Sequence, residues 1–374
     1  MLSRLPLITV SGRLFTLNYE FLDDLRRELD SFVSNNSHIN NRLFSKKIMF
    51  THELKANNTI EGINDDLEVI ERVIDNARQI KDEEKRNRII NLYRGYKFIL
   101  EGHDISEETF IKLYKILSND LLDRYSLANM GPRYRKNRVL ILNHGRMDDS
   151  YDEGVPYEWI QELMDCYFNY INNGEVFGDD TGYFIKSQIM HFYLVYIHPF
   201  FDVNGRTSRT TAMWYLLNHD IYPFIIFNRG INFDSTYDDT IKECKDRHEL
   251  TKFIRYMMIN TKKELEKEYV MHSLSSNNRR KLRSIDYQTL EYFITMTGQK
   301  SVLDFCCMYN RFNAKKRVVD IFYEMIYPFL EDGTFVVERE TKKNMFGNHK
   351  NMILSLNRDK LQGLDRSQLT RISL

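Results

Sequence analysis

One stretch of the chain is more informative than the rest: Ile197-His198-Pro199-Phe200-Phe201-Asp202-Val203-Asn204-Gly205-Arg206-Thr207-Ser208-Arg209. It lies between an apolar helical run and a second predicted helix, Thr210 to Asn218. A loop that leads into a helix N-terminus offers free backbone N–H groups and a partial positive charge, which together suit a phosphate. Asn204 and Gly205 permit the close turn that such a loop requires. The stretch therefore predicts a helical protein with an anion-binding loop.

Four polar residues in this stretch fit the chemistry of a nucleotide. Arg206 and Arg209 are three residues apart, so both guanidinium groups can project toward one anion and bind successive phosphates. Asp202 supplies a carboxylate oxygen of the kind that Mg²⁺ takes together with phosphate oxygens. His198 can titrate near pH 7 and act as a general base. Each residue alone is more typical of a core or a solvated face, whereas the combination within so short a stretch favours a catalytic site.

The segment HPFFDVNGRTSR resembles the Fic-domain signature HPFx(D/E)GNGRxxR and departs from it at one specified position. The family has a helical fold, and its members transfer AMP from ATP to a hydroxyl group of a target protein. The resemblance implies that His198 deprotonates that hydroxyl, that Asp202 holds Mg²⁺ and that Phe200 anchors the loop to the core. It assigns the nucleotide contacts to Phe201, Asn204, Gly205, Arg206 and Arg209. The related Doc branch has Lys in place of Arg206 and transfers phosphate, so Arg206 favours nucleotide transfer.

The departure from the signature is Val203, where the family usually has Gly. If this position needs a positive φ, a β-branched residue costs on the order of 1 to 2 kcal/mol or more. Either the turn adopts an ordinary conformation in this chain or the strain is tolerated. The geometry of the anion site depends on which of the two holds.

A second segment, Glu53 to Ile63, resembles the inhibitory helix of the family, (S/T)xxxE(G/N), with Asn57 in the Ser/Thr position. The resemblance implies that Glu61, followed by Gly62, pairs with Arg209 where the γ-phosphate of ATP must bind. The resemblance thus implies that the chain carries its own inhibitor. By itself, this short pattern fits a helix end capped at Gly62 equally well.

Residues 137–157 interrupt the helical pattern. Residues 138–142 have β-propensity, and the turn signal Asn143-His144-Gly145 follows them, so we expect a small hairpin. A resemblance to the Fic flap, which docks a segment of the target along a strand edge, rests on Gly131, Arg133, Val139, Ile141 and Pro156. It implies that Val139 and Ile141 are docking residues. We assign His191, seven residues before His198, to core packing.

The remaining sequence predicts a mainly α protein in three parts. The spacing of Phe21, Leu22, Leu25, Leu29 and Phe32 marks one apolar helix face, and most of the first 270 residues have such periodicity. We divide the chain into an N-terminal helical region (1–100) with the inhibitory helix at about 45–75, a Fic catalytic core (101–270) and a C-terminal domain (271–374). A polar stretch near 270–282 marks the last boundary.

The C-terminal domain has the order of elements that is typical of a winged helix-turn-helix. Helical patterns at about 287–296, 301–309 and 314–330 precede two predicted strands, 335–339 and 351–356, joined by a basic loop. Residues 279–374 contain 17 Lys/Arg and 11 Asp/Glu. One interpretation is a structural or dimerising domain; the other is DNA binding through the helix near 314–319 and the loop 342–350.

Composition limits the remaining classes of function. The 374 residues are 42% hydrophobic and 28% charged, a composition that excludes a disordered chain. The 53 Lys+Arg balance the 53 Asp+Glu, so the protein has no net charge that would attract it as a whole to nucleic acid. No stretch approaches the roughly 18 consecutive apolar residues that a membrane helix needs. The four cysteines lack the spacing of metal ligands. We therefore expect a cytoplasmic protein with reduced thiols and no membrane segment.

Three hypotheses follow. The first is a self-inhibited protein adenylyltransferase that uses ATP and Mg²⁺ and modifies a target protein or itself; a homodimer is expected by analogy with the family. The second keeps the same site, with Glu61 positioning a water that removes AMP from a modified protein. The third is a DNA-binding regulator whose Fic core senses nucleotide without turnover.

Overall fold

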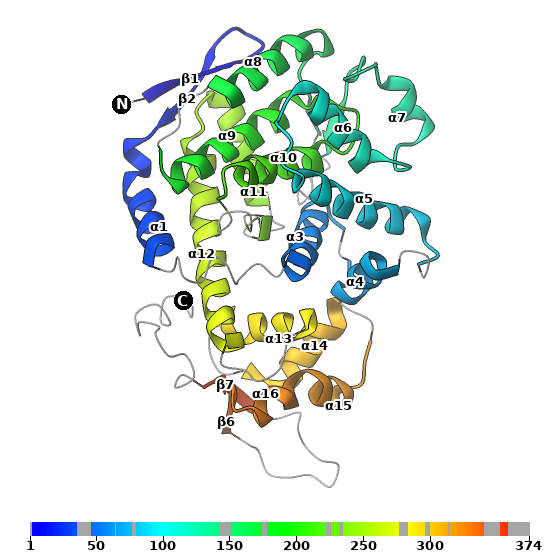
Figure 1. Cartoon of the computed structure of the whole chain (residues 1–374), viewed down its shortest axis with the longest axis vertical. Coiled ribbons are helices and arrows are strands. Elements are labelled where there is room, and N and C mark those ends of the chain that lie inside the picture. Colours follow the sequence, from blue (N-terminus) through cyan, green and yellow to red (C-terminus); the bar gives the residue numbers. More distant parts are fainter. Residues whose placement is uncertain are drawn as a thin grey trace.

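The computed structural model describes residues 2–35, 46–63, 65–76, 80–142, 151–173, 178–221, 226, 228–229, 231, 235–276, 283–295, 300–312, 315–339 and 352–357. The chain is mainly helical and contains small antiparallel strand pairs (Figure 1), which confirms the predicted fold class. Within these residues, no helix combines the length and the apolar character that a bilayer span demands.

A β-hairpin opens the chain, although the sequence had indicated a helical region there. Strands β1 (Leu2–Ile8) and β2 (Leu14–Asn18) pair antiparallel. Leu5, Leu7, Phe15 and Leu17 are buried on alternate positions, which is the period of a strand, and Gly12 takes a positive φ of 74° in the turn. Two alternations per strand are too few for the pattern to be distinguished from a short apolar run.

Helices form most of the described residues up to 276. Side-chain caps start several of them; Ser106 and Thr109, for example, form a reciprocal capping box before α6. The helical elements are η1 (Glu20–Leu22), α1 (Asp23–Asn35), α3 (Lys46–Ile60), α4 (Leu67–Asn76), α5 (Glu83–Ile99), α6 (Glu107–Ser118), α7 (Arg124–Asn129), η3 (Tyr157–Trp159), α8 (Ile160–Asn173), α9 (Asp180–Ile197), α10 (Asn204–Asn218), α11 (Ser235–Arg247) and α12 (Thr251–Ser276).

The predicted helix at the beginning of the chain is present as α1, but its expected apolar face is incomplete. Leu22 and Leu29 are buried, whereas Phe21 is 58% exposed and precedes α1 in the short helix η1. The guanidinium carbon of Arg255 lies 5.0 Å from the centre of the Phe21 ring. The Phe21 ring therefore packs against a side chain of α12 at the surface and is not buried in the core.

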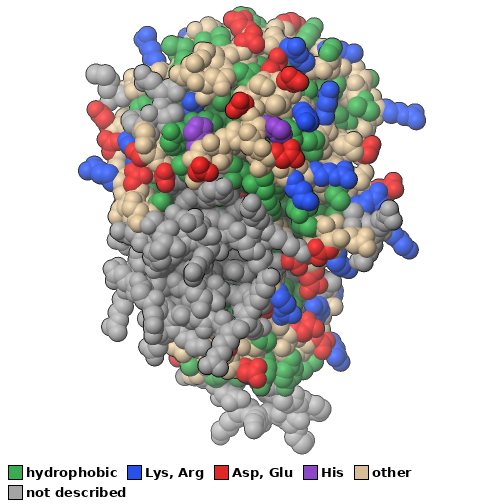
Figure 2. Space-filling view, viewed as in Figure 1, with side chains coloured by type: hydrophobic (Ala, Val, Ile, Leu, Met, Phe, Trp, Pro, Cys, Tyr) green, Lys and Arg blue, Asp and Glu red, His purple; other side chains and the backbone are tan. Residues whose placement is uncertain are grey.

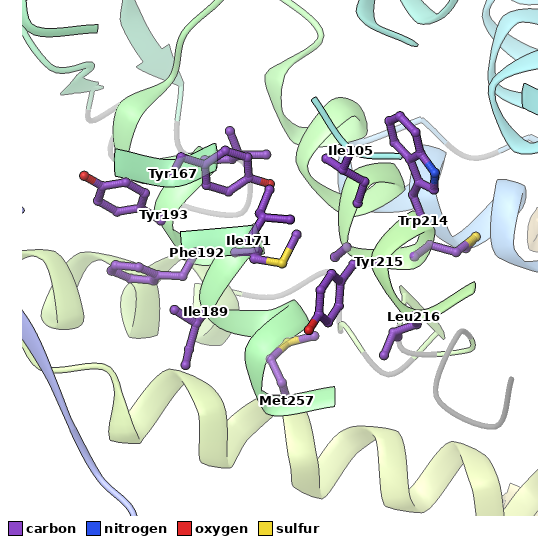
Figure 3. Packing of buried hydrophobic residues seen from close by; sticks show 14 of the residues in the cluster. Ile105, Tyr167, Ile171, Ile189, Phe192, Tyr193, Trp214, Tyr215, Leu216 and Met257 are labelled. Carbon is purple, nitrogen blue, oxygen red and sulfur yellow. The ribbon is translucent and has the colours of Figure 1, made fainter. Parts of the chain in front are cut away.

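Helices α9 and α10 are at the centre of the main core. Nearly every residue of α9 is buried, and α8, α10 and α12 pack against it. Side chains of these helices, among them Tyr167, Phe192, Tyr215 and Met257, converge in the interior (Figure 3). The loop between α9 and α10 is consequently held at both ends by two of the most deeply buried helices of the molecule.

The predicted hairpin after residue 137 is present. Strand β3 (Leu140–Leu142) pairs antiparallel with β4 (Tyr151–Glu153), with Ile141 opposite Asp152. The expected turn at 143–145 lies outside the described residues. The hairpin adjoins the α9–α10 loop because Arg135 N–H donates to the Pro199 carbonyl at 2.9 Å.

The C-terminal part contains the predicted order of helices and strands, with one strand more than expected. Its elements are α13 (Ser284–Thr295), β5 (Lys300–Ser301), α14 (Val302–Phe312), α15 (Val318–Ile321), the π-helical turn η5 (Phe322–Ile326), α16 (Tyr327–Glu331), β6 (Phe335–Arg339) and β7 (Ile353–Leu356). The sheet order is β5-β7-β6. Strand β5 has only two residues and so carries no periodicity of its own.

These elements enclose a second cluster of buried aromatic and aliphatic side chains, which includes Phe293, Phe305, Phe329 and Phe335. Helix α12 leads from the first core toward it (Figure 1) and extends to Ser276, into the polar stretch at which we placed a boundary. The domain boundaries and the winged-helix interpretation stay predictions, and the basic loop 342–350 lies outside the described residues.

Candidate functional site

A cavity of about 270 Å³ lies where the α9–α10 loop, the β3–β4 hairpin, the end of α3 and helix α11 meet. It brings together most of the residues that the sequence singled out. Its walls include His198, Phe201, Asp202, Asn204, Gly205, Arg209, Glu61 and Ile141. Arg206, Val139 and Gly62 do not line it.

Two residues with positive φ and the side chain of one asparagine give the loop its shape. His198 has φ 53°, so α9 ends there, and Val203 has φ 64° immediately before α10. Asn204 closes the loop, because its side-chain amide donates to the Phe200 carbonyl at 2.8 Å and accepts from the Phe200 N–H at 2.9 Å. The Phe200 ring is fully buried and stacks on Tyr114. The loop is therefore fixed to the core at the position that the sequence indicated.

Gly205 provides the floor of an anion site at the N-terminus of α10. A Cβ atom at this position would collide with the carboxylate of Glu61 and would lie 2.9 Å from a guanidinium nitrogen of Arg209. The carboxylate thus rests directly over the helix terminus, where N–H groups and the helix dipole favour negative charge. Only glycine leaves enough space for an anion there.

Arg209 binds this internal anion through an ion pair with Glu61. Its guanidinium group is almost completely buried, and its Nε donates to the Asn57 side chain at 3.0 Å. The Tyr237 hydroxyl approaches the same guanidinium and also lies 2.8 Å from Nε2 of His191. His191 is fully buried, as its assignment to core packing predicted, and it supports Tyr237 behind Arg209.

Gly62 ends the helix that carries Glu61. It has φ 77° two residues after the end of α3, and its N–H donates to the Thr59 carbonyl at 2.9 Å. A glycine-capped helix end thus places the Glu61 side chain over the α9–α10 loop.

Arg206 differs from expectation. Its side chain is buried and does not line the cavity, and its Nε has no hydrogen-bond partner among the described residues. Its charge acts on the Tyr114 hydroxyl and thereby opposes the rise in the pKa of that group. Residues three apart on a helix point about 60° away from one another, so equal spacing does not guarantee a shared ligand. Of the two arginines, only Arg209 lines the cavity.

His198 is neutral at pH 7 in this environment. Burial lowers its pKa to about 3, and the positive charges of Lys245 and Arg135 contribute to the decrease, whereas Glu61 opposes it. Its Nδ1 has no hydrogen-bond partner within the described part of the chain. A neutral imidazole at the wall of a cavity can accept a proton, and negative charge brought by a bound phosphate would raise its basicity.

Arg135 is a positioning residue that the sequence analysis missed. It is 3% exposed, and it donates to the carbonyls of His198 at 2.7 Å, Asn137 at 2.8 Å and Val155 at 2.5 Å. It therefore ties the backbone of His198 to both sides of the hairpin. Gly154 is the one local signal, because a Cβ atom there would lie 2.8 Å from the guanidinium group.

The neighbouring Arg133, one of the residues on which the resemblance to the flap rests, lies at the surface. It is exposed and pairs with Glu107 on α6 at 2.6 Å. The spacing of a flap pattern is loose, so the sequence did not separate the exposed arginine from the buried one.

The hairpin presents side chains that differ in part from those predicted. Ile141 lines the cavity and Leu140, 63% exposed, lies at its edge. Val139 is 5% exposed and faces inward. Helix α11 adds Tyr237, Asp238 and Lys245 to the wall, and no motif in the sequence indicated these three residues.

Asp202 is the residue that fits a metal ion. It is exposed at the edge of the cavity, and one carboxylate oxygen accepts from the Val203 N–H at 2.5 Å. Among the described residues, no three His, Cys, Asp or Glu side chains gather closely enough to bind a metal alone. One carboxylate beside an anion site fits Mg²⁺, which commonly takes one or two carboxylates together with phosphate oxygens and waters.

Comparison with known proteins gives a family for the central part of the chain. Residues 104–216 match the model of the Fic/DOC family. A solved Fic family protein from Desulfovibrio desulfuricans G20 is 16% identical; the alignment covers 92% of this chain and 97% of that one, with a TM-score of 0.57. Fic-1 from C. elegans (residues 134–508) is 14% identical over 70% of this chain and 74% of its own, with a TM-score of 0.51.

The matched segment contains the α9–α10 loop and the hairpin, but it contains neither α3 nor the C-terminal helices. Residues 104–216 are therefore similar to the Fic/DOC family, and at these identities the two solved structures show the fold alone.

Proposed function

We propose that this chain is a self-inhibited protein adenylyltransferase, which transfers AMP from ATP to a hydroxyl group of a target protein. The observation that carries the proposal is the carboxylate of Glu61 above Gly205, paired with Arg209. An anion from the chain itself occupies the site that an anionic ligand would need. This arrangement supports both parts of the proposal, a phosphate site and its occupation by an inhibitor.

The transfer assigns one role to each group at the cavity. The oxygen of the target hydroxyl bonds to the α-phosphorus of ATP, the bond to the oxygen that bridges to the β-phosphorus breaks, and pyrophosphate leaves. His198, neutral at pH 7, accepts the hydroxyl proton. The N-terminus of α10 and Arg209 hold phosphate charge once Glu61 has moved. Arg135 keeps the backbone of His198 in place.

Mg²⁺ would be held by Asp202 together with phosphate oxygens, and it would neutralise part of the phosphate charge. Ile141 and Leu140 border the cavity on the hairpin side, so they are the residues that a target segment would meet first.

The test is the transfer of label from ATP to protein. Wild type, Glu61→Gly, Glu61→Gln and His198→Ala are incubated with Mg²⁺ and with ATP labelled on either the α- or the γ-phosphate. We expect label from the α-position alone, more in both Glu61 variants than in wild type. Removal of a general base typically costs 10²- to 10⁴-fold in rate, so His198→Ala should lose label by about this factor.

Two outcomes would contradict the proposal. Label from the γ-position would mean that phosphate is transferred instead of AMP. Equal labelling of His198→Ala and wild type would mean that this histidine is not the base.

A second activity at the same site is hydrolysis of AMP from a modified protein. The observation that favours it is that Glu61 and His198 line one cavity and that the Glu61 charge acts on the imidazole. A carboxylate there can position a water. On a protein labelled beforehand with AMP, wild type should then remove the label and Glu61→Gly should not, although the same variant transfers AMP faster.

A further inference from the structure

The end of α3 and the start of α4 form a corner that joins the candidate site to the C-terminal helices. Glu61 follows α3, and Glu68 lies in the first turn of α4, seven residues later. We call the described residues 58–63 and 65–68 the inhibitory corner and the described residues between 284 and 357 the C-terminal module. A displacement of the corner necessarily moves Glu61.

Buried polar contacts hold the inhibitory corner together. Asp65 is 2% exposed and accepts from the Asn58 side chain at 2.9 Å. Two cations of α5 bind the same carboxylate, Lys85 at 3.2 Å and Arg88 at 3.4 Å. Asn58 belongs to the last turn of α3, so these contacts couple the end of the inhibitory helix to the start of α4. A force on α4 is therefore transmitted to Glu61.

Lys316 of the C-terminal module contacts this corner from a fixed position. Its backbone is held by Asn310, whose side chain accepts from the Lys316 N–H at 2.8 Å and donates to the Lys316 carbonyl at 2.9 Å. Its ammonium group lies 3.5 Å from a carboxylate oxygen of Glu68 and 2.8 Å from one of Glu324. It also lies 6.0 Å from the centre of the Tyr309 ring.

A second contact joins the C-terminal module to α4. Helix α13 packs against α4, and Figure 1 shows the two helices on adjoining parts of the molecule. Arg283, at the beginning of α13, binds Asp286 at 3.0 Å and the Glu324 carbonyl at 2.9 Å. Glu68, at the acidic start of α4, thus lies beside Lys316, a cation that contacts within the C-terminal module hold in place.

We propose that the C-terminal module is a clamp on the inhibitory corner, and that the contact of Lys316 with Glu68 helps to keep Glu61 on Arg209. This inference rests on the proposed function and concerns the regulation of the same site. A phosphate can replace Glu61 only if the corner moves, so every contact that fixes the corner adds to the free energy of opening. Any ligand that draws Lys316 away from Glu68 would act as an activator.

The test compares charge variants in the full chain. Lys316→Glu repels Glu68 and should strengthen ATP binding and increase AMP transfer by about two- to fivefold, the range expected for the loss of one partly exposed ion pair. Glu68→Lys should act in the same direction, and the double variant Lys316→Glu/Glu68→Lys, which restores opposite charges, should return toward wild type. Glu324→Gln is the matched control, because it removes the other partner of Lys316 without touching α4.

A variant that lacks the inhibitory glutamate shows whether Lys316→Glu acts through Glu61. In Glu61→Gly, the additional change Lys316→Glu should alter neither ATP affinity nor transfer, because the clamp acts only through Glu61. An undiminished effect of Lys316→Glu in that background would overturn the proposal. An ATP affinity equal to wild type in Lys316→Glu, beside a gain in Glu61→Gly, would overturn it as well and would leave the proposed function intact.

Hydrogen exchange tests the clamp even if no AMP is transferred. Amides of α3 near residues 57–60 should exchange about two- to fivefold faster in Lys316→Glu than in wild type and in Glu324→Gln. Faster exchange together with absent transfer would retain the clamp and reject the proposed activity. Unchanged exchange in α3 would reject the clamp whatever the activity.

Discussion

Val203 shows how a single residue accepts strain to shape the site. Its φ of 64° lies in the left-handed region, which costs a β-branched residue about 1 to 2 kcal/mol. The side chain is 1% exposed and belongs to the main core. Burial of a valine side chain contributes about 1.5 to 3 kcal/mol, which is enough to offset the strain. The turn therefore keeps the shape that glycine usually provides.

Paired substitutions at this position separate strain from burial. Val203→Ala loses the side chain and keeps the strain, whereas Val203→Gly loses both. We expect both variants to be less stable than wild type, with Val203→Gly more stable than Val203→Ala by about 1 kcal/mol in urea unfolding. A Gly variant less stable than the Ala variant would show that the positive φ costs nothing here.

At the scale of elements, α3 is unusual because polar side chains form much of its inner face. Thr51, Glu53, Asn57 and Asn58 are all fully buried. Glu53 binds Arg229 at 2.9 Å, and Arg229 also pairs with Glu268 of α12. Hydrogen bonds from buried polar side chains rather than a continuous apolar stripe therefore position the helix that leads to Glu61.

Burial of Glu53 makes the stability of this arrangement depend on pH. Burial raises the pKa of Glu53 from 4.5 to about 8, although Arg229 opposes the rise. Between these two pH values the folded protein keeps a proton that the unfolded chain releases, so stability decreases as the pH rises from about 4.5 to 8. The decrease from one such group cannot exceed about 1.4 kcal/mol per pH unit.

Glu53→Gln should remove this dependence. Urea unfolding between pH 5 and pH 8.5 should give a flatter stability profile for the variant than for wild type, and the two slopes should differ most near pH 6, midway between the two pKa values. Glu108→Gln, an exposed position on α6, is the control and should follow wild type. Parallel profiles for wild type and Glu53→Gln would show that the carboxylate is already ionised across this range.

At the scale of the whole molecule, two clusters of buried apolar side chains are joined by α12 and by the contact of α4 with α13. The acidic and basic side chains of the described residues are interspersed over the face in Figure 2. On the C-terminal module, Arg317 pairs with Asp320 at 2.8 Å and Lys316 with Glu324. The DNA hypothesis stays a prediction that the described surface does not distinguish from a structural role.

Calorimetry should resolve the two cores. Phe305 and Phe192 are both fully buried, the first in the C-terminal cluster and the second in the main one. Truncation of a core phenylalanine to alanine typically costs about 3 to 5 kcal/mol. We expect two thermal transitions, of which Phe305→Ala lowers one and Phe192→Ala the other. A single transition that both variants lower equally would show that the cores unfold as one unit.

The residues by themselves predicted the helical class and the loop at 198–209, because these features depend on residues close together in the chain. The pairing of Glu61 with Arg209 was implied only by the resemblance to the Fic family. Covalent geometry fixes the reach of His198, Asp202 and Gly205 within one loop, so their order already implies their neighbourhood. Strand β5 could not be predicted in this way because two residues establish no period.

Only the tertiary structure decided which side chains face the cavity. Arg135 and Tyr237 reach the site from segments far from 198–209, and Arg206 does not line the cavity although it lies in the loop itself. Such choices depend on how helices pack and which backbone groups remain without partners, and neither is encoded in local spacing. For the same reason, the contact of Lys316 with Glu68 joins residues 248 positions apart and has no signature in the sequence.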